Sequence, residues 1–278
     1  MYKVCAGTET YALRLYFEGV QAGPVLEELR WLEALSRDTD LRVTVPVRTL
    51  EGQVFLERDG RHAVLLRWLE GERVSRTMST GVAHALGRIA ATLHRHAQGH
   101  ARPDWRGARL DLAWFAGPDS WWKTRAARDL GEADYVRILP ALEQAEARMR
   151  ALGEDAMHFG VIPSDLHFGN VLEQADGGYA VLDFEGCALG FYAFDLAVTE
   201  LEFEDYNEAE ALLEAFRSSY AGAMGLRADP LEDVTLFRVP ASVAFLEWVF
   251  GSLNDGVRAE KLRWVPGVLE GMVRVGAG

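Results

Sequence analysis

Residues 161–172 read VIPSDLHFGNVL, and residues 179–185 read YAVLDFE. The first stretch places Asp165 and Asn170 in the pattern D-x-x-x-x-N between two apolar runs. Asp183 ends a short β-rich run that follows the turn sequence DGG. A hairpin of this kind predicts that Asn170 and Asp183 meet at one of its ends, although they lie thirteen positions apart.

This grouping of side chains suits phosphoryl transfer. Magnesium prefers oxygen ligands from carboxylates or amides together with phosphate and water, and Asn170 and Asp183 can supply them. A separate carboxylate must orient the attacking hydroxyl and accept its proton, a task that suits Asp165. Each residue alone is also typical of a capped turn or a strand end. The ordered combination, with Asp195 beginning a helical segment, favours the catalytic interpretation.

These stretches resemble the aminoglycoside phosphotransferase and choline kinase family, the phosphotransferase enzyme family, which also includes homoserine kinases. The resemblance rests on residues 165–170, 182–185 and 192–197, with weaker matches in family order from residue 11. It implies an enzyme that uses ATP and Mg²⁺ to phosphorylate a hydroxyl group. Asp165 would be the catalytic aspartate, and Asn170 and Asp183 would be the magnesium ligands.

The resemblance also implies a nucleotide site between two lobes. Adenine would lie near a hinge formed by Arg67, Trp68 and Leu69. Arg14 stands where the family usually places a phosphate-binding lysine, and Glu28 on the following helix would be its ion-pair partner. Arginine keeps the charge but differs in geometry. The alternative is an exposed Arg14 on an alternating strand and a solvated Glu28.

Two further residues would support the catalytic loop. We expect His167 to hold the shape of the loop, and Asp195 to accept backbone hydrogen bonds from it, a role compatible with capping a helix. Pro163 departs from the family, which usually has histidine there. Because proline offers neither a side-chain hydrogen bond nor a backbone donor, we expect another support for the loop and slower chemistry.

Hydrophobic periodicity outside these motifs indicates a β-rich beginning and a helical end. We expect strands over residues 2–6, 10–16, 43–50, 53–58 and 62–69, helices over 24–35, 79–96 and 132–152, irregular chain over 101–125, and mostly helix from residue 195. The fold class is therefore α+β, two-lobed and protein-kinase-like. Residues 1–70 would form a small antiparallel nucleotide-binding lobe, and residues 71–278 a larger, mainly helical lobe with the catalytic loop and substrate site.

The small lobe is expected to be truncated at its start, because the family has a strand and a glycine-containing loop before the strand at residues 2–6. Either the true start lies upstream, or the nucleotide is covered less completely and bound weakly.

The composition narrows the choice of partner. The 278 residues are 49% apolar and 26% charged, with a formal net charge of −13. This balance argues against nucleic acid and suits a cationic small molecule. No secretory signal or membrane-spanning run is evident, and Cys5 and Cys187 form no disulfide or zinc pattern. We therefore expect no membrane partner and a cytoplasmic protein.

The acceptor is expected to be a small molecule with a hydroxyl group, such as an aminoglycoside, an amino alcohol or a homoserine-like compound, or else a protein side chain. An acidic run could recognise an amine or could simply be a solvated helix face; it comprises Glu200, Glu202, Glu204 and Asp205. The tryptophans between residues 105 and 122 could form a lid over a ligand or pack in the core.

Two other classes compete with the active kinase. A pseudokinase would bind nucleotide or a partner without turnover, although it would have no chemical need for Asp165, Asn170 and Asp183 together. A metal-dependent hydrolase would use Asp165, His167, Asp183 and Glu185. A single histidine among oxygen ligands makes a poor zinc site, and a hydrolase does not explain the β-rich beginning.

Overall fold

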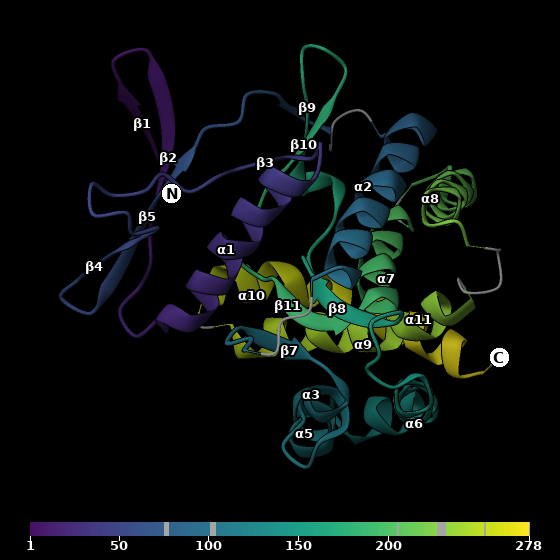
Figure 1. Cartoon of the computed structure of the whole chain (residues 1–278). Coiled ribbons are helices and arrows are strands. Elements are labelled where there is room, and N and C mark those ends of the chain that lie inside the picture. The colour runs from purple at the N-terminus through teal and green to yellow at the C-terminus, as the bar shows by residue number, and fades with distance from the viewer. Residues whose placement is uncertain (75–77, 101–103, 205, 227–231, 253, 278) are drawn as a thin grey trace.

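The computed structural model describes residues 1–74, 78–100, 104–204, 206–226, 232–252 and 254–277. Its first sheet is antiparallel, has the strand order β1-β2-β5-β4, and lies on the left of Figure 1. The strands are β1 (Tyr2–Ala6), β2 (Glu9–Leu15), β4 (Leu56–Arg58) and β5 (Arg61–Arg67). Helix α1 (Ala22–Asp38) follows β2 and contributes Leu29, Leu32 and Leu35 to the core. The predicted strands over residues 2–6 and 10–16 and the predicted helix over residues 24–35 are confirmed.

A second sheet joins chain segments that are far apart in the sequence. Its order is β3-β10-β9-β6, and β3 runs parallel to β10. The strands are β3 (Arg42–Val43), β6 (Glu72–Arg73), β9 (Val171–Glu173) and β10 (Tyr179–Val181). This sheet therefore links the segment after α1 to the hairpin that carries the DFE motif (Figure 1).

The prediction of a long strand over residues 43–50 is wrong. Only Arg42 and Val43 lie in a strand, and Pro46 makes a single isolated bridge to Leu66. Proline has no N–H to donate to a ladder, so the chain pairs only locally with β5, through Val45 and Val47. The next strand is also shorter than predicted and is confined to Leu56–Arg58.

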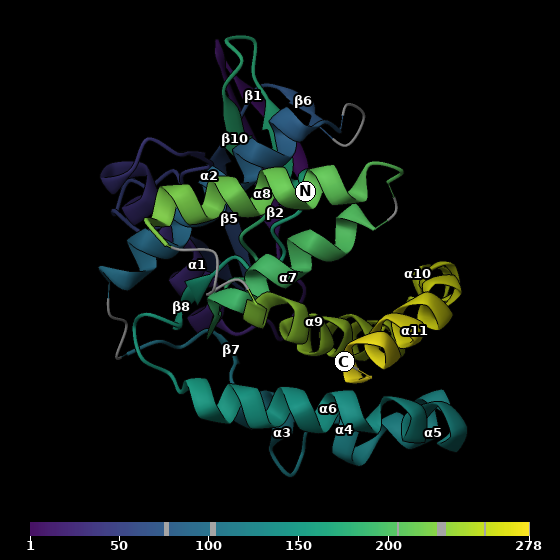
Figure 2. The same cartoon turned by 90° about the vertical axis from the view of Figure 1, so that its right-hand side faces the viewer.

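Helices form most of the remaining chain, as predicted. Figure 2 shows α2 (Thr80–Gln98), α7 (Tyr192–Phe203) and α8 (Ala209–Met224) on one side, and α6 (Glu132–Leu152) on the other. Between them lie α9 (Glu232–Gly251) and α11 (Val265–Gly276), with α10 (Asp255–Lys261) and a 3₁₀ turn, Leu262–Trp264, leading into α11. α2 packs on α8, and α7 packs on α9.

The segment predicted to be irregular, residues 101–125, contains regular structure. Its elements are β7 (Ala108–Leu110), α3 (Leu112–Ala116) and α4 (Trp121–Thr124), followed by α5 (Ala126–Leu130); residues 101–103 lie outside the described residues. The side chain of Asp111 begins α3 by accepting the backbone N–H of Trp114 at 2.9 Å, which is N-cap chemistry. β7 completes a sheet with β11 (Ala188–Phe191) and β8 (Phe159–Ile162).

The tryptophans of this segment pack in the protein rather than over a ligand. Trp121 and Trp122 are buried, and Trp121 stacks on Phe250 of α9. Trp114 packs edge-on against Phe194 of α7. Core packing, the second of the two interpretations, therefore describes these rings.

Helix α9 is long and apolar enough to cross a membrane by length and composition alone. Within the structure, however, it packs against α6, α7 and α11. Its buried side chains include Val234, Phe237, Val239 and Leu246. It is therefore the central helix of the helical region.

The contact between α2 and α8 depends on Gly87. A Cβ at this position would lie 2.3 Å from the carbonyl oxygen of Phe216 and 3.0 Å from the Cβ of Ser219. Gly87→Ala should therefore lower the free energy of unfolding by about 1–3 kcal/mol, as overpacking does. Gly222→Ala on α8, where a Cβ would meet nothing within 4 Å, should instead raise it by up to about 1 kcal/mol. Urea unfolding of the two variants measures both; equal effects would contradict this packing.

Candidate active site

The catalytic loop links Asp165 directly to Asn170. The loop passes from β8 into a one-turn 3₁₀ helix, Phe168–Asn170. The Nδ2 atom of Asn170 donates to both the backbone oxygen and Oδ2 of Asp165, at 3.1 Å each. Asn170 is buried, whereas the side chain of Asp165 is 56% exposed. The loop thus fixes the amide and leaves the carboxylate open to a reactant.

The β9–β10 hairpin brings the backbone of the DFE motif to Asn170. Val171 pairs with Val181, and the N–H of Leu182 donates to the carbonyl oxygen of Asn170 at 2.8 Å. Asp183 follows with a φ of 61°, a left-handed conformation that is uncommon for residues other than glycine. Its exposed carboxylate forms no hydrogen bond or ion pair with any described residue.

This donor set fits a magnesium ion. Asn170 uses its Nδ2 toward Asp165, so its Oδ1 can act as a ligand, and Asp183 adds an unpaired carboxylate. Hard oxygen ligands of this type, with places left for water and phosphate, are what magnesium prefers. The predicted neighbourhood of Asn170 and Asp183 is therefore present in the backbone.

A network of buried polar side chains is hydrogen-bonded to the backbone of the predicted catalytic loop. The Oδ1 atom of Asp195 accepts the N–H of Ser164 at 2.9 Å, and its Oδ2 lies 3.0 Å from Nε2 of His94. His94 in turn contacts the hydroxyl of Tyr220 at 2.9 Å through Nδ1. Asp195 and His94 are fully buried. Asp195 lies inside the first turn of α7 rather than at its N-cap, which is Phe191.

Ser164 provides the support that Pro163 cannot. Besides its N–H bond to Asp195, it donates its hydroxyl to the carbonyl oxygen of Gly186 at 2.6 Å. Ser164 also has a positive φ, of 63°. A second anchor is Thr199, whose hydroxyl donates to the carbonyl oxygen of Leu166 at 2.5 Å. Ser164 and Asp183, which both have a positive φ, thus flank the site, and hydrogen bonds hold Ser164 in this strained conformation.

His167 lies beside Asp165, the predicted catalytic aspartate. Its Nδ1 accepts the N–H of Gly169 at 3.1 Å, and its Nε2 lies 3.7 Å from Oδ2 of Asp165. Burial disfavours the charged ring, but the proximity of Asp165 and the charges of Glu202 and Asp183 outweigh it and raise the pKa of His167. The hydrogen bond to Gly169 is consistent with the predicted role in loop shape.

Arg14 and Glu28 form a buried ion pair. The Nη1 atom of Arg14 lies 2.7 and 2.9 Å from the two carboxylate oxygens of Glu28, so the alternative of two solvated side chains is wrong. Tyr16 joins them: its hydroxyl accepts from Arg14 at 3.0 Å and donates to Glu28 at 3.3 Å. Burial raises the pKa of Glu28 although Arg14 opposes this. Glu185 of the DFE motif lies 3.9 Å from Arg14, which links the pair to the motif that carries the predicted magnesium ligand Asp183.

The three predicted hinge residues differ in whether their backbone N–H already donates a hydrogen bond within the protein. The N–H of Arg67 donates to Val45, and the N–H of Trp68 donates to Thr10. The carbonyl oxygen of Arg67 accepts from the Thr44 hydroxyl at 2.9 Å. Among the three predicted residues, Leu69 therefore has the N–H that makes no backbone bond within the described chain. Sequence alone could not distinguish it from its neighbours.

The acidic run after Asp195 is partly structural. Both oxygens of the buried Glu200 accept from Arg217 at 2.6 Å, and Glu204 pairs with Arg238. These two carboxylates are therefore held by arginines, whereas the sequence had left open an amine site and a solvated helix face. Glu202 faces the catalytic loop closely enough to raise the pKa of His167. Asp205 lies outside the described residues.

Several residues of the site were not predicted. His94, Ser164, Thr199, Tyr16 and Tyr220 hold the predicted residues in place. Tyr16 could have been found, because it lies two positions after Arg14 and so shares its face of the strand. His94, a polar residue on the apolar face of a helix, was also a signal. Nothing local marked Ser164, Thr199 or Tyr220, whose contacts bridge distant segments.

The chain belongs to the phosphotransferase enzyme family, whose model matches residues 1–230. It is 30% identical over 193 residues to a homoserine kinase of Methylobacterium nodulans, which covers 68% of this chain and 56% of that kinase. The chain thus spans little more than half the length of this curated relative. It is also 27% identical to an uncharacterized protein of Deinococcus radiodurans over 93% of this chain and 75% of that protein.

Solved structures show the same fold at lower identity. A microcompartment-associated aminopropanol kinase superposes with a TM-score of 0.81 at 22% identity, covering 99% of this chain and 87% of that one. The choline kinase of Streptococcus pneumoniae superposes with a TM-score of 0.65 at 16% identity, covering 98% and 89%. The protein-kinase-like fold class is therefore confirmed. The division at residues 70 and 71 and the roles of the site residues stay predictions.

Loss of the Asp195 carboxylate should loosen the catalytic loop. Asp195→Ala leaves the Ser164 N–H and Nε2 of His94 without a partner, which should cost about 2–4 kcal/mol of unfolding free energy. Asp195→Asn should cost less, because its Oδ1 can still accept from Ser164 and His94 can exchange tautomers against the Tyr220 hydroxyl. Urea unfolding of both variants checks this order. Equal losses, or none, would show that the network does not hold the loop.

Proposed function

We propose that the protein is a kinase that uses ATP and Mg²⁺ to phosphorylate the hydroxyl of a small molecule. One observation carries this proposal. An exposed Asp165 is hydrogen-bonded to Asn170, and the backbone of Asn170 is bonded to the segment that carries the unpaired Asp183. These are the three side chains that phosphoryl transfer needs, and family membership supports the same activity.

The residues of this chain would divide the reaction between them. Asp165 would orient the acceptor hydroxyl and accept its proton. Asn170 and Asp183 would hold the magnesium ion, which neutralises charge on the phosphates when it is bound. Arg14 would contact the phosphates while Glu28 fixes its position, and the Leu69 backbone would contact adenine. His167 and Asp195 would keep the loop in shape.

The acceptor is best sought among amino alcohols and hydroxyl-bearing amino acids. The relatives include kinases of homoserine, aminopropanol and choline, and the chain carries a net charge of −13, which favours cationic ligands. Glu202 near His167 is a candidate for contact with an amine. We further propose that the protein acts in the cytoplasm without a nucleic-acid or membrane partner.

Removing the proposed metal ligand and the proposed base should have different effects. Asp183→Ala should abolish magnesium-dependent ATP binding, because Asp183 supplies the only carboxylate of the two proposed magnesium ligands. Asp165→Asn should retain binding but lower kcat by about 10²–10⁴-fold, the usual contribution of a general base. Calorimetry with ATP and Mg²⁺, and phosphorylation of a panel of homoserine, aminopropanol, choline and aminoglycosides, measure the two effects.

Asp176→Asn is the matched control, because this exposed carboxylate lies in the turn of the same hairpin and pairs with Arg42. It should bind ATP and turn over as the wild type does. Magnesium-dependent binding by the wild type without turnover of any acceptor would favour the pseudokinase. No ATP binding by the folded wild type would contradict the kinase assignment.

Variants of the buried ion pair can separate the effect of Arg14 on phosphate binding from its effect on the stability of the fold. Arg14→Met leaves the Glu28 carboxylate buried without its partner, which should destabilise the fold by about 3–5 kcal/mol. The double variant Arg14→Met, Glu28→Leu should recover most of that loss, because both charges are removed. It should still bind ATP weakly. Wild-type ATP affinity in the double variant, measured by calorimetry, would remove Arg14 from the phosphate site.

A further inference from the structure

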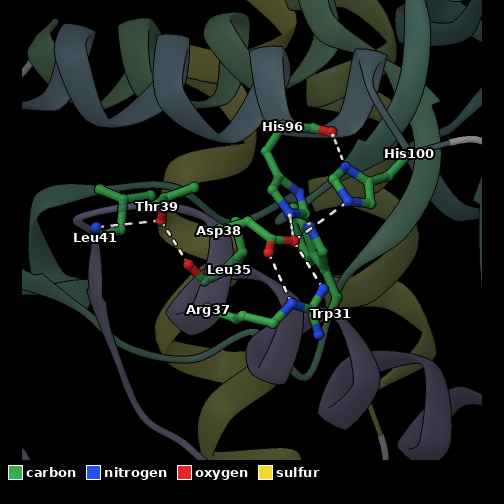
Figure 3. A network of polar contacts seen from close by, with 8 residues as sticks. All are labelled: Trp31, Leu35, Arg37, Asp38, Thr39, Leu41, His96 and His100. Carbon is green, nitrogen blue, oxygen red and sulfur yellow. Dashed lines mark hydrogen bonds and ion pairs between the residues drawn. The ribbon is translucent and has the colours of Figure 1, made fainter.

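Three side chains outside the active site converge where α1 and α2 end. Asp38 is the last residue of α1, and His96 and His100 lie one helical turn apart at the end of α2 and just beyond it (Figure 3). Oδ2 of Asp38 lies 3.4 Å from Nε2 of His96 and 3.3 Å from Nε2 of His100. The two imidazoles are stacked, with centroids 4.0 Å apart. The proposed catalytic roles use none of these residues.

Hydrogen bonding fixes the orientation of His100. Its Nδ1 lies 2.8 Å from the carbonyl oxygen of His96, and because a carbonyl oxygen can only accept, Nδ1 carries the proton. In the neutral ring Nε2 therefore presents a lone pair toward the carboxylate of Asp38. Two lone pairs at 3.3 Å repel each other unless a proton or a metal ion lies between them. A second nitrogen that donates to a backbone carbonyl is also the usual arrangement of a metal-binding histidine.

His96 is oriented by the indole of Trp31. The Nε1–H of Trp31, which can only donate, lies 3.3 Å from Nδ1 of His96. In the metal-free protein the proton of His96 is therefore on Nε2, which donates it to Asp38. A metal ion at Nε2 requires this proton to move to Nδ1, at the expense of the bond from Trp31. Trp31 thus opposes metal binding through His96.

The two distances from Asp38 suit a tetrahedral ion, and the stacked imidazoles must turn before both lone pairs, which lie in the ring planes, can point at one ion. Zinc bonds of about 2.0–2.2 Å place neighbouring ligand atoms of a tetrahedron roughly 3.3–3.6 Å apart, and the two distances to Asp38 are 3.3 and 3.4 Å. All three ligand atoms lie within 4.8 Å of one another. Two imidazoles and one carboxylate favour zinc over magnesium. We propose that Asp38, His96 and His100 bind a zinc ion that joins the ends of α1 and α2.

The surroundings leave room for the ion and a water ligand. The cluster borders a pocket of about 840 Å³ between α2 and the segment 38–41, which is also lined by His84, Arg88 and Tyr179. Arg37 pairs with both oxygens of Asp38, at 2.7 and 2.8 Å, and would hold the carboxylate while its Oδ2 contacts the metal. The fourth position of the ion would face this pocket.

Zinc binding is tested by calorimetry on the full chain without a polyhistidine tag and without nucleotide. The wild type should bind one zinc ion with micromolar or tighter affinity, and zinc should raise its melting temperature. His100→Gln and Asp38→Asn should each weaken binding by more than about tenfold. His84→Ala, on the same helix and in the same pocket, is the matched control and should bind as the wild type does.

Trp31→Phe distinguishes zinc binding through His96 from a cluster that is held together only by electrostatic attraction. It removes the N–H that opposes protonation of Nδ1, so zinc should bind several-fold more tightly, provided that circular dichroism shows a folded protein. Unchanged or weaker binding in folded Trp31→Phe would remove His96 from the ligand set and overturn the three-ligand site. The proposal also fails if the wild type binds no zinc, or if His100→Gln binds it as tightly as the wild type.

Discussion

The buried carboxylate of Asp195 is the constraint on which the candidate site depends. It accepts the backbone N–H of Ser164 with one oxygen and contacts His94 with the other, at full burial. A buried carboxylate is tolerable only if hydrogen bonds satisfy it, so this position fixes helix α7, helix α2 and the loop relative to one another. The loop can then hold Ser164 in a left-handed conformation and present Asp165 to solvent.

A second buried polar cluster, the Arg14–Glu28 ion pair, lies on the other side of the site. Arg14 and Glu28 bring α1 to the first sheet through a pair that is almost entirely buried. Such pairs contribute little net stability but fix geometry, since either charge left alone is costly. Glu185 lies within 3.9 Å of Arg14, so this pair also relates the β-rich region to the hairpin that carries Asp183. Two buried polar clusters, rather than one, thus hold the segments that carry the predicted catalytic residues.

The sequence predicted the parts of this arrangement that local patterns encode. The D-x-x-x-x-N spacing and the predicted hairpin placed Asn170 and Asp183 together, and the backbone bond from Leu182 to Asn170 bears this out, although the strand ends at Val181, before Asp183. The alternation along β2 predicted a strand, but burial of Arg14 depends on α1 packing against it. Contacts such as Ser164 with Asp195 join residues 31 positions apart, and no periodicity reports them. Pro46 misled the strand assignment because an extended chain without an N–H pairs only in part.

The central claim is that Asn170 and Asp183 together hold a divalent metal ion with a nucleotide. The most direct measurement is a crystal structure with Mn²⁺ in place of Mg²⁺ and a non-hydrolysable ATP analogue, with the metal located by its anomalous scattering. The account predicts a manganese peak within bonding distance of Asn170 Oδ1 and the Asp183 carboxylate, near the phosphates. A nucleotide bound without metal at these two residues, or a metal held elsewhere, would contradict it.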